Sequence, residues 1–195
     1  MIPAFLLILS AVAYRIVTGL FAPSNAIGWL NFAPLAAIAL CAAAYFPAKY
    51  KFSVPMIALL LSDVVLNIHY GFSFLSPFVL SHYIGFALVG CLGLLLQKRA
   101  SWKTLLPGSI AASLIFYGIT NSVSWLYDPG YAKNFAGWVQ ALTVGLPAYG
   151  ATPTWMFFRN SLVSDLFFTA LFVLCMNFGR STERSRAASA LPRAA

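Results

Sequence analysis

Apolar stretches of about 20 residues recur along this chain, and they restrict it to a membrane fold, since about 20 apolar residues let a helix cross a bilayer. Hydrophobic residues make up 61% of the 195 residues and charged residues only 8%, against about 25% charged in a soluble domain. We therefore expect an all-α integral membrane protein, a six-transmembrane-helix bundle forming one domain over residues 1–180. The predicted spans are Ile2–Phe21, Ile27–Phe46, Ser53–His69, Pro77–Gln97, Thr104–Leu126 and Trp155–Phe178.

Lysine and arginine residues gather in alternate connections between these spans. Two connections hold most of them, the one after the second span and the one after the fourth: Lys49, Lys51, Lys98, Arg99 and Lys103. The connections on the other side hold only Lys133, and a basic tail follows the sixth span. Because basic loops stay in the cytoplasm, we predict that both termini are cytoplasmic. The net charge of +8 is then a topology signal, so the expected partner is the lipid bilayer and not nucleic acid. Residues 181–195 are small, polar and basic, and we expect a disordered cytoplasmic tail.

The connection between the fifth and sixth spans is long and aromatic. It opens with WLYDPGY, in which Pro129-Gly130 predicts a turn. It continues as NFAGWVQALTVGL, which predicts a helix in the membrane interface, where Trp and Tyr residues are enriched. We therefore expect an extracytoplasmic aromatic loop with an interfacial helix at this place. A loop of this length is often a lid or a binding element, and a plain interfacial anchor is the alternative.

Polar residues inside the spans are few and unevenly distributed. Asp63 stands in the middle of the third span, where a carboxylate costs roughly 2.5 to 3.5 kcal/mol on insertion scales. At about 1.5 Å per residue from the cytoplasmic ends, the costly residues all lie from the midplane outward: Arg15, Asp63, His82, Asn121, Arg159 and Asp165. The cytoplasmic halves are almost purely apolar. This asymmetry predicts a polar cavity that is open to the outside.

Equal depth suggests a partner for one of the buried acids. Arg15 and Asp165 both lie roughly 20 Å from the cytoplasmic ends of their spans at 1.5 Å per residue, so we predict an intramembrane ion pair between them. Three roles are compatible with the buried charges: pairs that hold the bundle together, groups that line a ligand pocket, and a proton or ion relay.

Hydroxyl, amide and indole groups crowd the outer end of the fifth span, and such groups suit a small polar or aromatic ligand. Together with the buried polar residues they define the predicted ligand-binding set: Asp63, Asn67, His82, Asn121, Trp125, Tyr131, Arg159 and Asp165. The two histidines, His69 and His82, lack HxxxH spacing, so no metal site is predicted. The sequence contains no P-loop, GxGxxG or HExxH motif. It therefore indicates no enzyme and leaves the cofactor unknown.

Several short motifs resemble one known family. They are NFAPLAAIAL in the second span, LLLSD in the third, TN followed by W at the end of the fifth, and RN…SD in the sixth. Together they resemble DUF6580, an uncharacterised bacterial family, over roughly residues 28 to 175, and the resemblance implies a membrane transport protein. That family is similar to the substrate-binding S-components of energy-coupling factor (ECF) vitamin transporters. The resemblance implies a six-helix bundle in the bacterial cytoplasmic (inner) membrane, with a substrate pocket in its outer half.

The resemblance also bears on partners. S-components commonly carry an alanine-rich face on the first span, which docks on a coupling subunit. Here the clear small-residue face is on the second span, at positions 33/37 and 39/43, and packing inside the bundle or docking to a partner would both use it. A coupling subunit and ATPase supplied by other chains, transport without a partner, and membership of a larger membrane complex therefore all stay open.

The predicted function is that of a substrate-binding membrane transport protein. Its ligand would be a small molecule, a vitamin-like compound or a metal chelate, held in an outward-facing pocket. The alternative is a structural or accessory subunit of a larger membrane protein complex, in which the buried acids and arginines form internal ion pairs.

Overall fold

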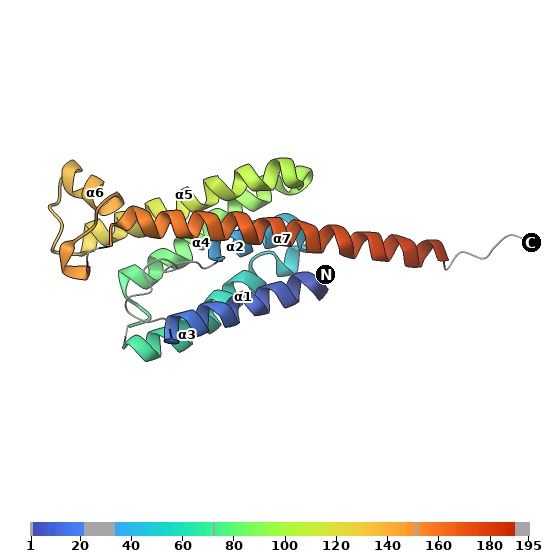
Figure 1. Cartoon of the computed structure of the whole chain (residues 1–195), viewed down its shortest axis with the longest axis horizontal. Helices are drawn as coiled ribbons and strands as arrows, with labels where there is room; N and C mark the ends of the chain where they lie inside the picture. The colour runs from blue at the N-terminus through green and yellow to red at the C-terminus, as the bar shows by residue number, and fades with distance from the viewer. Residues whose placement is uncertain (1, 22–33, 72, 151, 190–195) are drawn as a thin grey trace, which may run out of the picture.

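The structure is a computed structural model that describes residues 2–21, 34–71, 73–150 and 152–189. Within these ranges the chain is all-helical, as predicted (Figure 1). Five of the described helices are long and apolar enough to cross a membrane, which indicates a multi-pass membrane protein. They are α1 (Ile2–Phe21), α3 (Ser53–Tyr70), α4 (Pro77–Leu96), α5 (Trp102–Tyr127) and α7 (Thr154–Ser189).

The second predicted span corresponds to a short helix in the centre of the bundle. The helix α2 (Leu35–Tyr45) has 11 residues, which is too few to cross about 30 Å of hydrocarbon, and the earlier part of that span lies outside the described residues. Each residue from Ala36 to Ala44 is buried, because α2 packs against α3, α4, α5 and α7. The small residues of α2 are therefore used inside the bundle, which leaves no described alanine face of this helix for a partner protein.

Small residues let α2 and α4 approach each other closely. Gly93 on α4 lies so near the backbone carbonyl of Leu40 that a Cβ atom at this position would overlap with it. Close backbone approach at glycine and alanine is the usual basis of helix packing in membranes, where lipid tails supply no hydrophobic driving force between helices.

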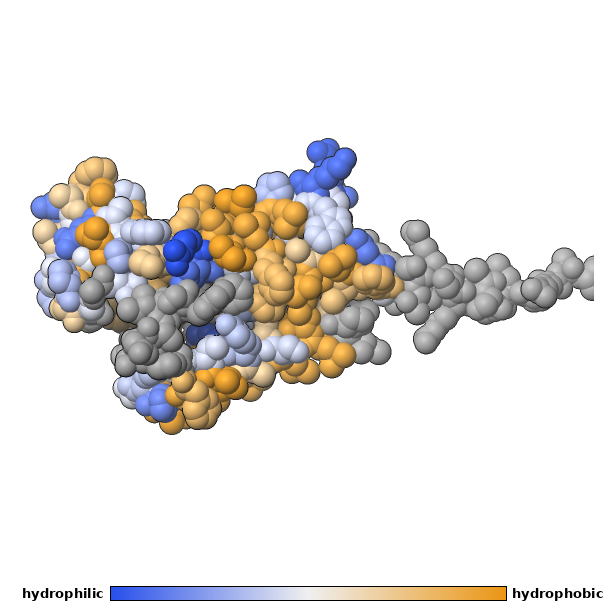
Figure 2. Space-filling model, viewed as in Figure 1, coloured by the Kyte–Doolittle hydropathy of each residue, from blue (hydrophilic) through white to orange (hydrophobic). Residues whose placement is uncertain are grey.

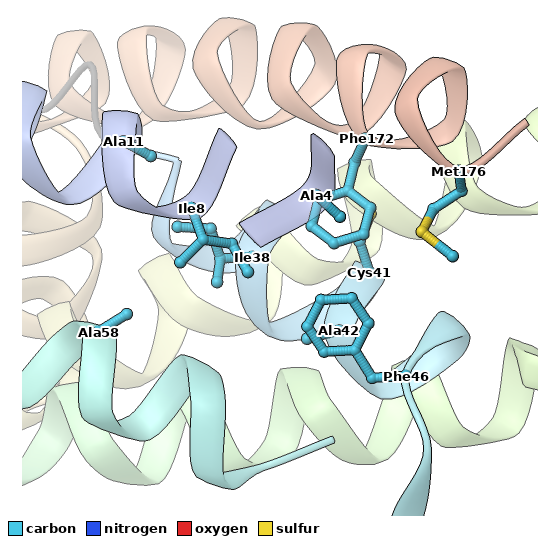
Figure 3. Packing of buried hydrophobic residues seen from close by; sticks show 10 residues of the cluster. All are labelled: Ala4, Ile8, Ala11, Ile38, Cys41, Ala42, Phe46, Ala58, Phe172 and Met176. Atoms are coloured by element: carbon cyan, nitrogen blue, oxygen red, sulfur yellow. The ribbon is translucent and has the colours of Figure 1, made fainter. Parts of the chain in front are cut away.

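Apolar side chains pack on both sides of α2. One cluster joins α2 to α1, α3 and α7 and contains Ile8, Ile38 and Phe172 (Figure 3). The other joins it to α4 and α5 and contains Leu40 and Phe86. Large apolar side chains also cover the outside of the helices over the middle of the molecule (Figure 2). An exposed apolar exterior of this kind suits lipid rather than water.

The start of α1 and the end of α7 lie at one end of the bundle, and α6 (Phe135–Leu142) lies at the other (Figure 1). At the first of these ends, the ring of Phe5 stacks on Phe46 at 5.2 Å and meets Tyr50 edge-on at 6.3 Å. Lys51 donates a hydrogen bond to Gln97, so the α2–α3 and α4–α5 connections meet there. The connections that carry most of the basic residues therefore share one end with the N-terminus.

The other end is covered by residues 128–150 and 152–153, which we call the cap. Asp128 accepts a hydrogen bond from the backbone N–H of Gly130 at 2.8 Å, which forms the predicted turn at Pro129-Gly130. Asn134 then caps α6 by accepting from the N–H of Gly137 at 2.9 Å. The indole N–H of Trp138 donates to Ser122 of α5 at 2.9 Å. The cap is thus fastened to the end of α5.

The last helix extends beyond the predicted span. It continues through Ser189, so residues 181–189 are helical, contrary to the prediction of a disordered tail, and residues 190–195 lie outside the described ranges. The segment contains Ala, Arg and Glu residues, which favour helices. It also continues a helix that already exists, so it avoids the unfavourable nucleation step.

Candidate functional site

A cavity of about 240 Å³ lies among α1, α2, α4, α5 and α7. Six of its lining residues belong to α5. Their spacings of three and four positions place them along one face of that helix. Four more are spaced three or four residues apart along α7. The lining residues are Arg15, Leu35, Ala36, His82, Ser113, Phe116, Tyr117, Thr120, Asn121, Ser124, Thr154, Phe157, Ser161 and Asp165.

The wall of the cavity combines aromatic rings with hydroxyl and amide groups. The imidazole of His82 stacks on Phe116, with ring centroids 5.8 Å apart and an interplanar angle of 26°. Thr120 donates to the carbonyl of Phe116 at 3.0 Å, and Asn121 donates to the carbonyl of Tyr117 at 2.9 Å. These bonds within α5 hold the polar side chains in fixed orientations beside the cavity.

Asp165 lies where the start of α2 meets the cavity, and it is only 2% exposed. Its Oδ1 accepts a hydrogen bond from the backbone N–H of Ala37 at 3.0 Å. This N–H belongs to the first turn of α2, where no partner exists within the helix, and Pro34 at the N-cap supplies no side-chain bond. Asp165 therefore caps α2 from another helix, and its acidic group meets the positive end of the α2 dipole.

The structure corrects the predicted ion pair. The Nη1 atom of Arg15 lies 2.8 Å from Oδ1 of Asp63, and the same atom donates to Ser62. Arg15 and Asp165 both line the cavity, yet they form no ion pair with each other within the described residues. Equal depth does not determine which faces two helices present to each other, and α1 packs along α3, the helix that carries Asp63.

Two predicted residues lie just outside the cavity on α3. Asp63 is 3% exposed and Asn67 is 8% exposed. Within the described residues, Oδ2 of Asp63 and Nδ2 of Asn67 have no hydrogen-bond partner. Neither residue lines the cavity. Arg15 connects Asp63 to it, because Arg15 pairs with Asp63 and also lines the cavity.

Three other predicted residues belong to the capped end of the bundle and do not line the cavity. The indole of Trp125 donates to the carbonyl of Ala132 at 2.9 Å. Tyr131 is buried in the cap, and this burial, with a smaller effect of the nearby Asp128 carboxylate, raises the pKa of its phenol above the ordinary value. Arg159 is exposed and donates to Asn160 at 3.1 Å. Of the eight predicted ligand residues, the cavity wall contains His82, Asn121 and Asp165.

Some wall residues were missing from the predicted set. Ser113, Tyr117 and Phe157 are the clearest examples. Helical spacing could have identified them, since Ser113 and Tyr117 lie four residues apart and Tyr117 precedes Asn121 by four. Phe157 similarly lies two turns before Asp165. The described residues bring no three His, Cys, Asp or Glu side chains together as a metal site would require, and the site is made mainly of neutral polar and aromatic groups.

Comparison with known proteins identifies the family. No curated protein and no solved structure matches the chain. The model of one family, "Family of unknown function (DUF6580)", matches residues 1–187. This match covers all of the described helices except the last residues of α7, and it agrees with the resemblance carried by the motifs of the second, third, fifth and sixth predicted spans. The chain therefore belongs to the DUF6580 family.

Proposed function

We propose that this protein is a substrate-binding membrane transport protein that holds a small molecule in the cavity among α1, α2, α4, α5 and α7. The observation that carries the proposal is the composition of the cavity wall. It joins a guanidinium, a carboxyl group, an imidazole, an amide and several hydroxyls around a space of about 240 Å³. Polar groups are costly to bury in a membrane protein, and a wall with so many of them suits a polar ligand.

The size and chemistry of the cavity narrow the ligand class. Pockets for drug-sized ligands have volumes of roughly 300–1,000 Å³, so this cavity of about 240 Å³ suits a smaller compound. Phe116 and Phe157 offer aromatic faces, and Thr120, Asn121 and Ser161 offer hydrogen-bonding groups. A vitamin-like compound with one flat ring and polar substituents fits this wall better than a bulky metal chelate.

We place the protein in a bacterial cytoplasmic membrane with six spans and both termini in the cytoplasm. The α2 helix and the residues before it would form the second crossing. The start of α1 and the basic connections lie at the same end of the bundle, which supports this orientation (Figure 1). The cap then faces the outside as an aromatic interfacial element, and the cavity lies on the same side.

A cysteine introduced as Lys133→Cys should react with an impermeant maleimide in intact cells, and Ser101→Cys should react only after permeabilisation. The reverse pattern would overturn this orientation.

Transport would take its energy from elsewhere, because the sequence contains no nucleotide-binding motif. A coupling subunit and an ATPase supplied by other chains would provide it in an ECF-like arrangement, and an ion gradient would provide it otherwise. The similarity to S-components stays a prediction, and co-purification of an ATPase with the tagged protein would support it.

A pair of threonine variants tests ligand binding. Thr120 lines the cavity and Thr143 lies outside it, and each hydroxyl donates to the carbonyl four residues earlier, at 3.0 Å and 2.7 Å. Vitamin-like compounds would be screened by thermal shift against purified wild-type protein, Thr120→Leu and the matched control Thr143→Leu. We expect at least one compound to raise the melting temperature of the wild type and the control but not that of Thr120→Leu. Equal shifts in all three proteins, or no shift with any compound, would contradict the proposal.

A second function is supported by a specific observation. The carboxyl groups of Asp63 and Asp165 both have internal partners, in Arg15 and in the first turn of α2. Groups satisfied in this way suit a structural or accessory subunit of a larger membrane complex. That function would be supported by co-purification of partners in fixed stoichiometry together with an absence of any thermal shift.

A further inference from the structure

Asp165 is a buried acid without a cationic partner in the described part of the chain. It is 2% exposed, and the ion pair that the described residues contain joins Arg15 to Asp63 instead. Carboxylates buried within a membrane usually pair with a cation or are neutralised by a proton. The hydrogen bonds around Asp165 distinguish between a charged and a neutral group.

The contacts of the Ser113 hydroxyl indicate whether Asp165 carries a proton. Its Oγ lies 2.8 Å from Oδ2 of Asp165 and 3.0 Å from the backbone carbonyl oxygen of Ser109. Both neighbours are acceptors if Asp165 is ionised, yet a serine hydroxyl carries a single proton. One of the two contacts would then lack a hydrogen. A proton on Oδ2 of Asp165 removes the conflict, because Asp165 donates to Ser113 and Ser113 donates to the carbonyl of Ser109.

A neutral Asp165 keeps its other hydrogen bond as well. Its Oδ1 is then the carbonyl oxygen of a carboxylic acid, and it still accepts from the N–H of Ala37 at 3.0 Å. The protonated group therefore satisfies the hydrogen bonds around it, those accepted from backbone N–H groups at the start of α2 and one donated to α5. The ionised group satisfies one contact fewer, and it has beside it only the partial positive charge of the α2 N-terminus and no cation.

The groups one helical turn away do not compensate a negative charge. Cys41 on α2, Ser109 on α5 and Thr169 on α7 are all fully buried, and each lies four residues from a residue of the Ala37–Ser113–Asp165 contact. The hydroxyls of Ser109 and Thr169 have no hydrogen-bond partner within the described residues. This layer is therefore neutral, and it separates Asp165 from the end of the bundle where α1 begins.

The charged and titratable groups on the remaining sides all lie around the cavity. They are Arg15 on α1, His82 on α4 and Tyr117 on α5. Arg15 is engaged with Asp63, and Tyr117 donates to the carbonyl of Leu142 at 2.7 Å. Since Asp165 itself lines the cavity, a proton reaches it from that side.

We propose that Asp165 is a proton-binding site, at which a proton bridges Oδ2 of Asp165 and Oγ of Ser113 and exchanges through the cavity. Any ligand that bonds to the carboxyl group then competes with this proton or uses it as a hydrogen-bond donor. A protein of the proposed function would in this way link ligand binding to proton binding. The proton site does not depend on that function, since Asp165 titrates whether or not the cavity takes a ligand.

Infrared spectroscopy tests the proposal directly, because the chain has only four acidic residues. Full-length protein in lipid nanodiscs would be measured at neutral pH in H₂O and D₂O, as wild type, Asp165→Asn and the control Asp128→Asn. We expect the carbonyl band of a protonated carboxylic acid, sensitive to deuterium, in the wild type and the control. The band should be absent from Asp165→Asn. A wild-type protein without this band at neutral pH, or an Asp165→Asn protein that retains it, would overturn the proposal.

Thermal melting gives a second readout. Asparagine reproduces the donor and acceptor pattern of the protonated acid, so Asp165→Asn should melt within about 3 °C of the wild type, whereas Asp165→Ala should melt about 5 °C lower or more. The melting temperature of the wild type should fall as the pH rises and the acid loses its proton, and that of Asp165→Asn should not. A bound sodium ion would instead appear as stabilisation by NaCl over choline chloride that Asp165→Asn lacks. That result would contradict a proton site. If Asp165→Asn fails to fold, the pH titration of the wild-type infrared band decides the question.

Discussion

Removing one member of the Arg15–Asp63 pair should destabilise the protein strongly. The pair is buried, with side-chain exposures of 16% and 4% and a distance of 2.8 Å between Nη1 and Oδ1. Loss of one partner from a buried ion pair costs about 3–5 kcal/mol, because the remaining charge stays buried without compensation. For a chain of this size about 1 kcal/mol corresponds to roughly 2–4 °C in melting temperature. We therefore expect Asp63→Leu to melt about 6–20 °C below the wild type.

Replacing both members with apolar residues should restore most of the stability. A buried pair exchanged for apolar side chains of similar volume is often neutral or stabilising, so the double variant Arg15→Met/Asp63→Leu should melt close to the wild type. Melting would be followed by circular dichroism of the purified protein in detergent for the wild type, both single variants and the double variant. Because each single substitution should cost about 3–5 kcal/mol and the double substitution almost nothing, the coupling free energy from this cycle should be about 6–10 kcal/mol.

A parallel cycle distinguishes the observed pair from the pair predicted by depth. The variants Arg15→Met and Asp165→Asn should have additive effects on the melting temperature, since these residues form no ion pair within the described part of the chain. The reasoning from the structure would be refuted if the Arg15 and Asp63 substitutions were additive, or if Arg15 and Asp165 showed the larger coupling.

Three further predictions concern packing, the cap and pH. Gly93→Ala should lower the melting temperature, because the new Cβ would overlap with a backbone carbonyl of α2, whereas Gly118→Ala, with nothing within 4 Å, should leave it unchanged or raised; equal effects would argue against the close helix approach. Trp138→Phe should cost about 1 kcal/mol through loss of its bond to Ser122, and Ser122→Ala should cost nothing more in that background. Burial raises the phenol pKa of Tyr131, so its contribution to stability is fully present below the unfolded-state pKa of about 10 and is lost as the pH rises through the folded-state pKa. An ultraviolet difference titration of wild type against Tyr131→Phe measures this pKa, and an ordinary phenol value would contradict the prediction.

Hydropathy alone was sufficient to predict most of the helices. The first predicted span, Ile2–Phe21, coincides with α1, and the third begins at Ser53 as α3 does. Such boundaries follow from apolar length and from local signals, such as Pro77 in the first turn of α4 behind the N-cap Ser76. The end of α7 was not predicted. Its polar composition was interpreted as disorder, but a polar segment can stay helical when it continues a helix that is already packed.

The site was predicted less completely, since sequence distance gives depth but not the direction in which a side chain points. Asp63 and Asp165 are buried and Arg15 is partly buried, yet the partner of Arg15 was assigned from depth alone. The cap of α2 by Asp165 joins residues that are far apart in sequence, and no local pattern indicates it. Ser113 and Tyr117, by contrast, share one face of α5 with Asn121, and periodicity within that helix predicts their place in the wall.

An experimental structure of the purified protein in lipid nanodiscs would be the most direct test of ligand binding in the cavity. We expect non-protein density for a small molecule in the cavity, in contact with Asn121, Ser161 and Asp165, when the protein is prepared with a compound that raises its melting temperature. A cavity filled by the protein's own side chains, or density for that compound only outside the bundle, would contradict it.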